Sequence, residues 1–153
     1  MSTRKSDGID FAARSRSRRR ALQAIYAWQM SGTPLARLLE EFAHEQDMNV
    51  ADAAYFEDLV TGVVRGAKAL DEALSGFLDR GIDQVDPIER GVLRIAAYEM
   101  LHRPDVPYRV VINEAIETTK RFGADHGHSY INGVLDKAAA QWRAVEAEAA
   151  RKG

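Results

Sequence analysis

Apolar side chains recur every three or four residues along most of the chain, and this spacing restricts the fold more than any other feature of the sequence. Between residues 52 and 78 the recurrence runs through Phe56, Val60, Val63, Ala67, Leu70 and Leu74. At about 100° per residue, such positions form one stripe of a helix. No segment alternates apolar and polar residues between turn signals, so we predict no β-strand. The sequence therefore predicts an all-α protein.

Residues that start and stop helices divide this pattern into segments. Thr33 and Asp86 each precede a proline, as N-cap residues do, and Glu89 follows Asp86 at the capping-box position. Gly123 ends a periodic segment. The predicted helices cover residues from about 12 to 30, 34 to 43, 52 to 78, 87 to 102, 108 to 122 and 129 to 145. About six to seven helices with short connections form a bundle.

The length and composition suit one small globular protein of 153 residues. We expect an N-terminal tail over 1–11, a helical domain over 12–145 with subdomains of about 12–80 and 81–145, and a C-terminal tail over 146–153. The absence of cysteine excludes a disulfide scaffold and thiolate zinc sites. No apolar run approaches the roughly 20 residues that span a bilayer, and no signal-peptide pattern follows the basic start. We therefore expect a soluble cytoplasmic protein.

Positive charge is concentrated at the start of the chain. The first 20 residues hold seven Lys or Arg and two Asp, a net charge of +5, and the other 133 hold 14 against 21, a net charge of −7. Five arginines lie between residues 14 and 20. On a helix, Arg14 and Arg18 continue the line of Leu22 and Ile25, so we expect the basic side chains to overhang the edge of the core. Such a patch suits a polyanionic partner.

Three interpretations of the arginine run stay open at this point. It is a solvated N-terminus, a phosphate-binding arm, or part of a helix-turn-helix reader of DNA. Arginine forks and the nearby Tyr26 favour the second, because guanidinium groups hold phosphates and aromatic rings stack on unpaired bases. The basic residues precede any short glycine turn, which disfavours the third.

Signals for a cofactor, a metal or a catalytic site are weak or missing. His126 and His128 share a loop, but two histidines without further ligands do not define a zinc site. The sequence contains no nucleophile-elbow motif and no glycine-rich phosphate loop. We therefore predict a non-enzymatic protein without metal or cofactor.

Several stretches, in order along the chain, resemble the NusB family of bacterial transcription antitermination factors. They are RRRALQAIYAWQMS at 18–31, YFEDLVTGV at 55–63, IERGVLRIAAYEML at 88–101, VPYRVVINEAIETTKRFG at 106–123 and YINGVLDKAA at 130–139. The resemblance covers about residues 14–139. It implies an all-helical fold of two subdomains that binds boxA RNA in the leaders of ribosomal RNA operons.

The resemblance also implies partners and the residues that meet them. A small-subunit ribosomal protein, acting as NusE, pairs with the chain, and the pair joins RNA polymerase and other Nus factors; relatives occur as monomers or homodimers. The implied RNA-binding residues are Arg14, Arg16, Arg18, Arg19, Tyr26, Lys120, His126 and Tyr130. The implied residues for the ribosomal protein are Phe77, Asp83, Glu89, Arg94 and Glu99.

Two other functions compete with antitermination. NusB-like domains also guide some ribosomal RNA cytosine methyltransferases, but a chain that ends at Gly153 would hold no nucleotide-binding α/β domain. The second alternative is a helical scaffold for protein interactions that never binds RNA.

Overall fold

The computed structural model describes residues 5–6, 8–44 and 50–152, and the predicted loop at 44–50 therefore lies mostly outside the described residues. The described residues form seven α-helices, which confirms the all-α prediction. The chain divides into two compact units, Met1–Arg65 and Gly66–Gly153. The boundary falls inside α3 (Ala53–Ser75), whereas the sequence pattern suggested a subdomain boundary after residue 80.

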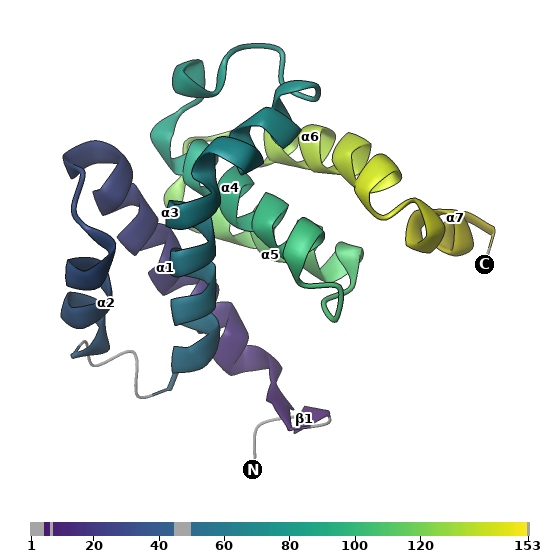
Figure 1. The fold of residues 1–153 in the computed structure, drawn as a ribbon. Helices are drawn as coiled ribbons and strands as arrows, with labels where there is room; N and C mark the ends of the chain where they lie inside the picture. The colour runs from purple at the N-terminus through teal and green to yellow at the C-terminus, as the bar shows by residue number, and fades with distance from the viewer. Residues whose placement is uncertain (1–4, 7, 45–49, 153) are drawn as a thin grey trace. The chain divides into compact units, whose positions relative to one another are not determined.

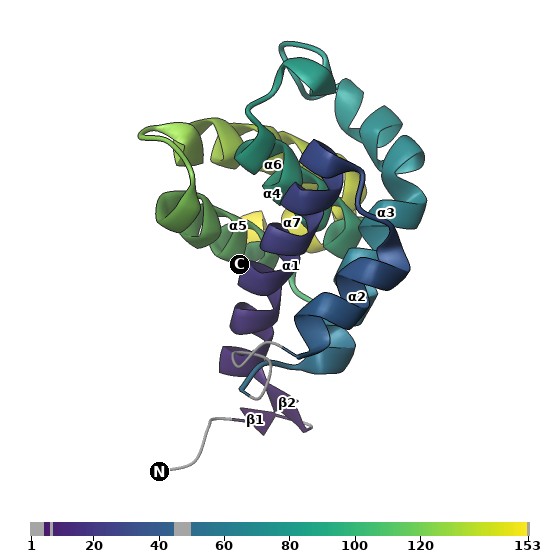
Figure 2. The ribbon, with the colours of Figure 1, turned by 90° about the vertical axis from the view of Figure 1, so that its left-hand side faces the viewer.

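The N-terminal unit is built around one long helix. Its elements are β1 (Lys5–Ser6), β2 (Ile9–Asp10), α1 (Phe11–Ser31), α2 (Leu35–Ala43) and the first part of α3. Helix α2 packs against α1, and the hairpin precedes the start of α1 (Figures 1 and 2). The buried apolar side chains of α1 are Ala13, Ala21, Leu22, Ala24 and Ile25. They follow the periodicity that the sequence shows.

Two local predictions for this unit need correction. The prediction of no strand is wrong, because Lys5–Ser6 and Ile9–Asp10 pair antiparallel around the positive-φ residue Gly8. Helix α2 has Pro34 as its N-cap residue, without a side-chain cap, so Thr33 does not cap it. The predicted end of α1 is confirmed, because the helix ends at Ser31 and Gly32 is its C-cap residue, with a φ of 66° that glycine adopts easily.

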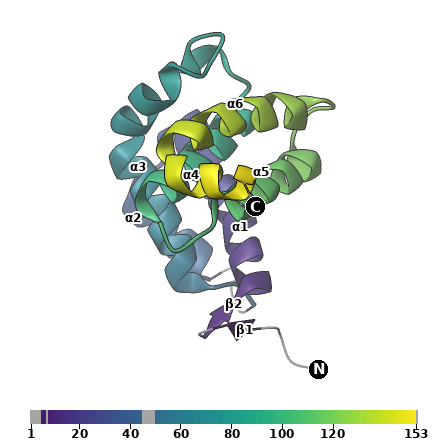
Figure 3. The same cartoon turned by 90° about the vertical axis from the view of Figure 1, so that its right-hand side faces the viewer.

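The C-terminal unit is a cluster of helices around α4 (Figure 3). Its elements after α3 are a 3₁₀ turn η2 (Ile82–Gln84), α4 (Pro87–His102), α5 (Tyr108–Phe122), α6 (Gly127–Trp142) and α7 (Ala144–Lys152). Helices α4, α5 and α6 pack against one another, and α7 packs on α6. Asp86 caps α4 by accepting from the N–H groups of Ile88 and Glu89 at 3.0 and 3.2 Å, as predicted.

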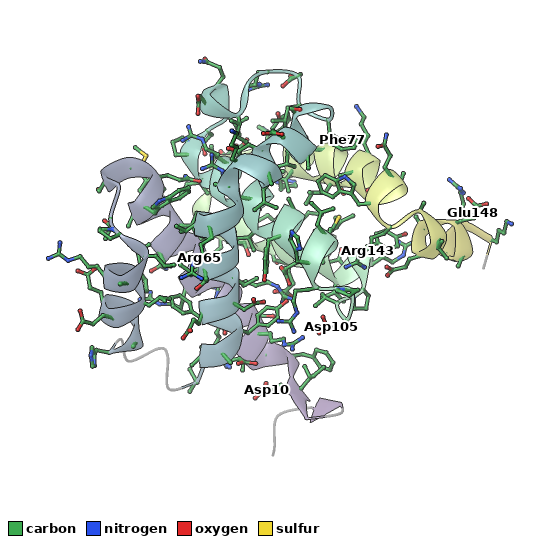
Figure 4. All side chains as sticks on the ribbon, in the orientation of Figure 1. Asp10, Arg65, Phe77, Asp105, Arg143 and Glu148 are labelled. Carbon is green, nitrogen blue, oxygen red and sulfur yellow. The ribbon has the colours of Figure 1, made fainter. Side chains whose placement is uncertain are left out.

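The predicted C-terminal tail is helical in the described residues, and Arg143, just before α7, explains how this end is held. Its guanidinium donates to the carbonyl oxygens of Met100, Glu99 and Arg103 at 2.9, 3.3 and 3.0 Å. These carbonyls lie at the C-terminal end of α4, where the helix dipole favours a cation. The Glu99 and Arg103 carbonyls also accept from the backbone N–H groups of Arg103 and Val106. Arg143 also pairs with Glu146 at 2.6 Å, and its side chain is only 9% exposed (Figure 4).

Glu146 extends this connection to the next helix. Its second carboxylate oxygen accepts from the N–H of Tyr108 at 2.9 Å, at the start of α5. The N-cap residue of α5 is Pro107, whose side chain makes no cap, so Glu146 supplies the missing acceptor. The α4–α5 turn and the start of α7 therefore stabilise each other.

We expect Arg143→Met to lower the free energy of unfolding by about 2–4 kcal/mol, because it leaves three helix-end carbonyls and Glu146 without their charged donor. The measurement is urea denaturation followed by circular dichroism. Arg151→Met is the matched control, because the Arg151–Glu148 pair on α7 is exposed and should contribute less than about 0.5 kcal/mol. A loss for Arg143→Met no larger than that of the control would contradict this role.

Candidate nucleic-acid interface

The arginine run lies entirely within the first turns of α1. The Asp10 side chain accepts from the Ala13 N–H at 3.0 Å and fixes the start of the helix. Residues 14–20 are therefore helical, and their side chains point in directions that differ by about 100° per residue. The run consequently divides between a buried and an exposed face.

Arg14 and Arg18 lie on the buried face. Arg18 is 5% exposed and donates to the Tyr55 hydroxyl at 3.3 Å. The Arg14 guanidinium lies 4.2 Å from the centre of the Tyr55 ring and 3.9 Å from an Asp52 carboxylate oxygen. The expectation that these arginines overhang the core is therefore wrong. They are held inside the N-terminal unit by an aromatic ring and a carboxylate, which together compensate their burial.

Ser17 fixes the same region of α1 against the start of α3. Its hydroxyl is fully buried, donates to the Asp52 carbonyl at 2.6 Å and accepts from the Asp52 N–H at 2.9 Å. Asp52 in turn caps α3 by accepting from the Tyr55 N–H at 3.0 Å. Ser17 is thus a structural member of the arginine run, a role that the sequence alone does not indicate.

Arg16, Arg19 and Tyr26 share the opposite face of α1. At about 100° per residue they fall within an arc of about 80°, away from the buried residues. Tyr26 is 38% exposed, and both arginines are half-buried. Arg16 donates to the Val50 carbonyl at 3.2 Å. We call these three residues the basic stripe of α1.

The other predicted RNA-binding residues surround the loop between α5 and α6 in the C-terminal unit. Lys120 is exposed in the last turn of α5 and lies 3.9 Å from Glu117. His126 is exposed and has a φ of 71°, an uncommon left-handed conformation for a residue other than glycine. Helix α6 therefore begins at Gly127, before the predicted start at Ser129.

Tyr130 makes contacts that the sequence does not reveal. Its hydroxyl donates to Asp79 at 3.3 Å, and the Arg80 guanidinium lies 4.9 Å from the centre of its ring. The hydrogen bond from Arg80 lowers the pKa of the Asp79 carboxyl. Burial and the negative Asp79 raise the pKa of Tyr130, so its hydroxyl remains a donor at neutral pH. Asp79 and Arg80 precede Tyr130 by about 50 residues, so no local pattern connects them.

The residues expected to meet a ribosomal protein differ in accessibility. Asp83 is exposed in η2, and Phe77 is half-buried with its ring edge-on to Trp142 at 5.5 Å. Arg94 and Glu99 are buried, at 7% and 1% exposure. Neither of these two presents a surface to a partner in this conformation.

Arg94 has a partner within its own unit. It forms a two-pronged ion pair with Asp71, with its Nε and Nη2 2.9 and 2.8 Å from the two carboxylate oxygens. The positive charge of Arg94, which was expected to meet a partner, therefore joins α4 to α3.

Glu89 lies where α4 approaches the start of α6. A Cβ atom added at Gly127 would lie 2.6 Å from a Glu89 carboxylate oxygen, so the two helices meet closely there. Burial, followed by the charge of Asp86, raises the pKa of Glu89. Glu89 is half-buried, which leaves part of it available to a partner.

Among the described residues, no helix is long and apolar enough to cross a membrane. Within the same ranges, no three His, Asp or Glu side chains group as metal ligands would. The fold and the basic stripe are those of an all-α protein with a surface suited to a polyanion.

Comparisons with known proteins place the chain in a family. The model of the NusB family matches residues 15–140. Transcription antitermination protein NusB of Xanthomonas oryzae pv. oryzae (strain PXO99A) is 63% identical over 145 residues, which is 95% of this chain and 93% of the relative. The protein of the same name from Xanthomonas campestris pv. campestris (strain B100) is 62% identical over 145 residues, or 95% and 91% of the two chains. The chain belongs to the NusB family, as the resemblance predicted.

Solved structures share the fold. T. maritima NusB superposes with a TM-score of 0.73 at 27% identity, covering 84% of this chain and 91% of that one. A chain in the crystal structure of antitermination factors NusB and NusE in complex with dsRNA also superposes, with a TM-score of 0.72 at 22% identity. The match covers 87% of this chain and 98% of that one, and it shows a shared fold only.

Proposed function

We propose that this protein is a transcription antitermination factor that binds boxA RNA of ribosomal RNA operon leaders. The observation that carries the proposal is 63% identity, over 95% of the chain, to a transcription antitermination protein NusB. The protein acts in the cytoplasm as an adaptor and catalyses no reaction. Its partners are a small-subunit ribosomal protein acting as NusE and RNA polymerase with other Nus factors.

The basic stripe of α1 is the proposed RNA contact in the N-terminal unit. Arg16 and Arg19 have the planar forks that hold phosphate oxygens, and Tyr26 has an exposed ring on which a base can stack. Arg14 and Arg18 keep a role in the proposal as supports, because their contacts with Tyr55 and Asp52 orient the helix that carries the stripe.

The loop before α6 is the proposed RNA contact in the C-terminal unit, with Lys120, His126 and Tyr130 as its members. The proposed protein partner meets the acidic side of the same unit. Asp83 and Glu89 supply negative charge there, and Phe77 supplies a half-buried ring. A basic ribosomal protein complements such a surface.

The salt dependence of RNA binding tests the proposal. If about four phosphates are neutralised, a plot of log K against log salt concentration should have a slope of roughly −3 for single-stranded RNA. The measurement is fluorescence anisotropy with labelled boxA RNA between about 50 and 300 mM salt, with and without the ribosomal protein. Light scattering on the same samples gives the molar mass and reveals any homodimer. A slope near zero, or no binding in either condition, would contradict the proposal and favour the protein scaffold.

A further inference from the structure

Arg80, which is not among the predicted site residues, lies against the predicted RNA-binding residue Tyr130 in the C-terminal unit. The guanidinium lies over the ring at 4.9 Å, and Asp79 contacts both residues. We infer that Arg80, stacked on Tyr130 and oriented by Asp79, is itself an RNA contact that takes a base on its plane and a phosphate on its free N–H groups. This inference rests on the proposed function, because it assigns a further residue to the RNA site.

The geometry holds the guanidinium in one orientation. Its Nε and Nη2 atoms donate to the two carboxylate oxygens of Asp79 at 2.7 and 3.0 Å. An exposed ion pair between neighbouring residues contributes little by itself. Here Tyr130 adds a second constraint, because its ring supports the guanidinium and its hydroxyl donates to the same carboxylate at 3.3 Å. Asp79 and Tyr130 together hold the Arg80 side chain in one rotamer, which reduces the conformational entropy lost when a ligand binds.

The pair also remains able to accept a ligand. The side chain of Arg80 is 46% exposed. A guanidinium has five N–H groups, and the two bonds to Asp79 leave three for a phosphate. Arg80 further lines an open hollow of about 410 Å³ together with Ser75 and Ile82, so a nucleotide has space beside it.

The stacking changes how Tyr130 can act. A guanidinium already occupies one face of the ring, so a base that approaches from that side meets Arg80 first. Guanidinium planes stack on bases as aromatic rings do. We call the Arg80 guanidinium on the Tyr130 ring the platform. In this platform Tyr130 is the support, and Arg80 is the group that the RNA contacts.

Charge and contact can be separated by two variants. Arg80→Gln should weaken boxA RNA binding about tenfold, because it removes the stacking plane and donors and leaves Asp79 negative beside the RNA. The double variant Asp79→Asn with Arg80→Gln restores the local net charge. We expect it to remain at least about threefold weaker than the parent protein, since the platform is still missing. If the double variant binds RNA as tightly as the parent protein, Arg80 only neutralises the charge of Asp79, and the inference is overturned.

The matched control directly follows the C-terminal end of α4. Arg103 forms the same two-pronged pair with Asp105, with both distances 3.0 Å. Arg80 precedes the first residue of α4 by seven residues and Arg103 directly follows its last residue, so the whole of α4 lies between the two pairs in the sequence. Arg103→Gln changes the net charge equally and should leave RNA affinity within about twofold. Thermal unfolding of each variant shows that it is folded.

The outcomes distinguish this inference from the proposed function. If the parent protein does not bind boxA RNA, the proposed function fails. If the parent binds and Arg80→Gln behaves like Arg103→Gln, only the inference about Arg80 fails. If Arg80→Gln leaves RNA binding unchanged and weakens binding of the ribosomal protein, the platform serves the protein partner, which also overturns the inference.

Discussion

Replacing Arg16 and Arg19 together with glutamine should lower the affinity for boxA RNA about 30-fold near 0.1 M salt. Both side chains are half-buried on the face of α1 opposite its buried residues, and loss of about 1 kcal/mol for each charge-assisted phosphate contact gives this factor. The slope of log K against log salt should become shallower by about 1.4, because two fewer phosphates are neutralised. Fluorescence anisotropy over the salt series measures both quantities.

The control for this prediction is Arg18→Gln, on the opposite face of the same helix. Arg18 is 5% exposed and bonded to Tyr55, so its loss should reduce the free energy of unfolding by about 1–3 kcal/mol. Where circular dichroism shows the variant to be folded, its salt slope should match that of the parent. The division of α1 into a basic stripe and a structural face would be contradicted if Arg18→Gln changed the slope and the Arg16, Arg19 variant did not.

Removing the negative partner of Arg94 should cause the largest loss of stability. Asp71→Asn leaves a guanidinium that is 7% exposed without its two-pronged carboxylate. Breaking a buried ion pair by removing one partner costs about 3–5 kcal/mol, because the remaining charge stays desolvated. For a protein of this size, that corresponds to a decrease in Tm of about 6–20 °C. Urea and thermal denaturation measure the effect.

Two further variants show whether the effect arises from the buried charge. Replacing both partners, as Asp71→Leu with Arg94→Met, should recover much of the loss, since no charge then remains buried. Asp105→Asn breaks an exposed pair with Arg103 and should cost less than about 1 kcal/mol. A loss below about 1 kcal/mol for Asp71→Asn would show that Arg94 does not depend on this carboxylate.

The helices of this chain were largely predictable because their signals are local. Asp86 caps α4 as its sequence context indicates, and α5 ends before Gly123 as predicted. The start of α6 was placed too late, because His126 adopts a left-handed conformation that sequence patterns do not assign to histidine. The predicted N-cap of α2 differs from the observed one by one residue, because Thr33 suits an N-cap and Pro34 the first helical position, whereas the helix begins at Leu35.

The distribution of charge between surface and interior was not predictable. Periodicity placed Arg18 in line with the core residues of α1, but its partner Tyr55 comes 37 residues later and is recognised only in the fold. Arg143 likewise reaches carbonyls of residues about 40 positions earlier. A carbonyl carries no sequence signal, because every residue has one. Arg80 is not predictable either, because it contacts the ring of Tyr130, which comes 50 residues later in the sequence.

The most direct test of the account is to map boxA RNA on the protein by NMR, which a 17.0 kDa chain permits. Amide resonances of ¹⁵N-labelled protein are followed during titration with the RNA. We expect the largest shifts around Arg16, Arg19 and Tyr26 on α1 and in the segment from Lys120 to Tyr130. Shifts confined to the end of α4 and to α7, or no shifts at all, would contradict the proposed RNA site.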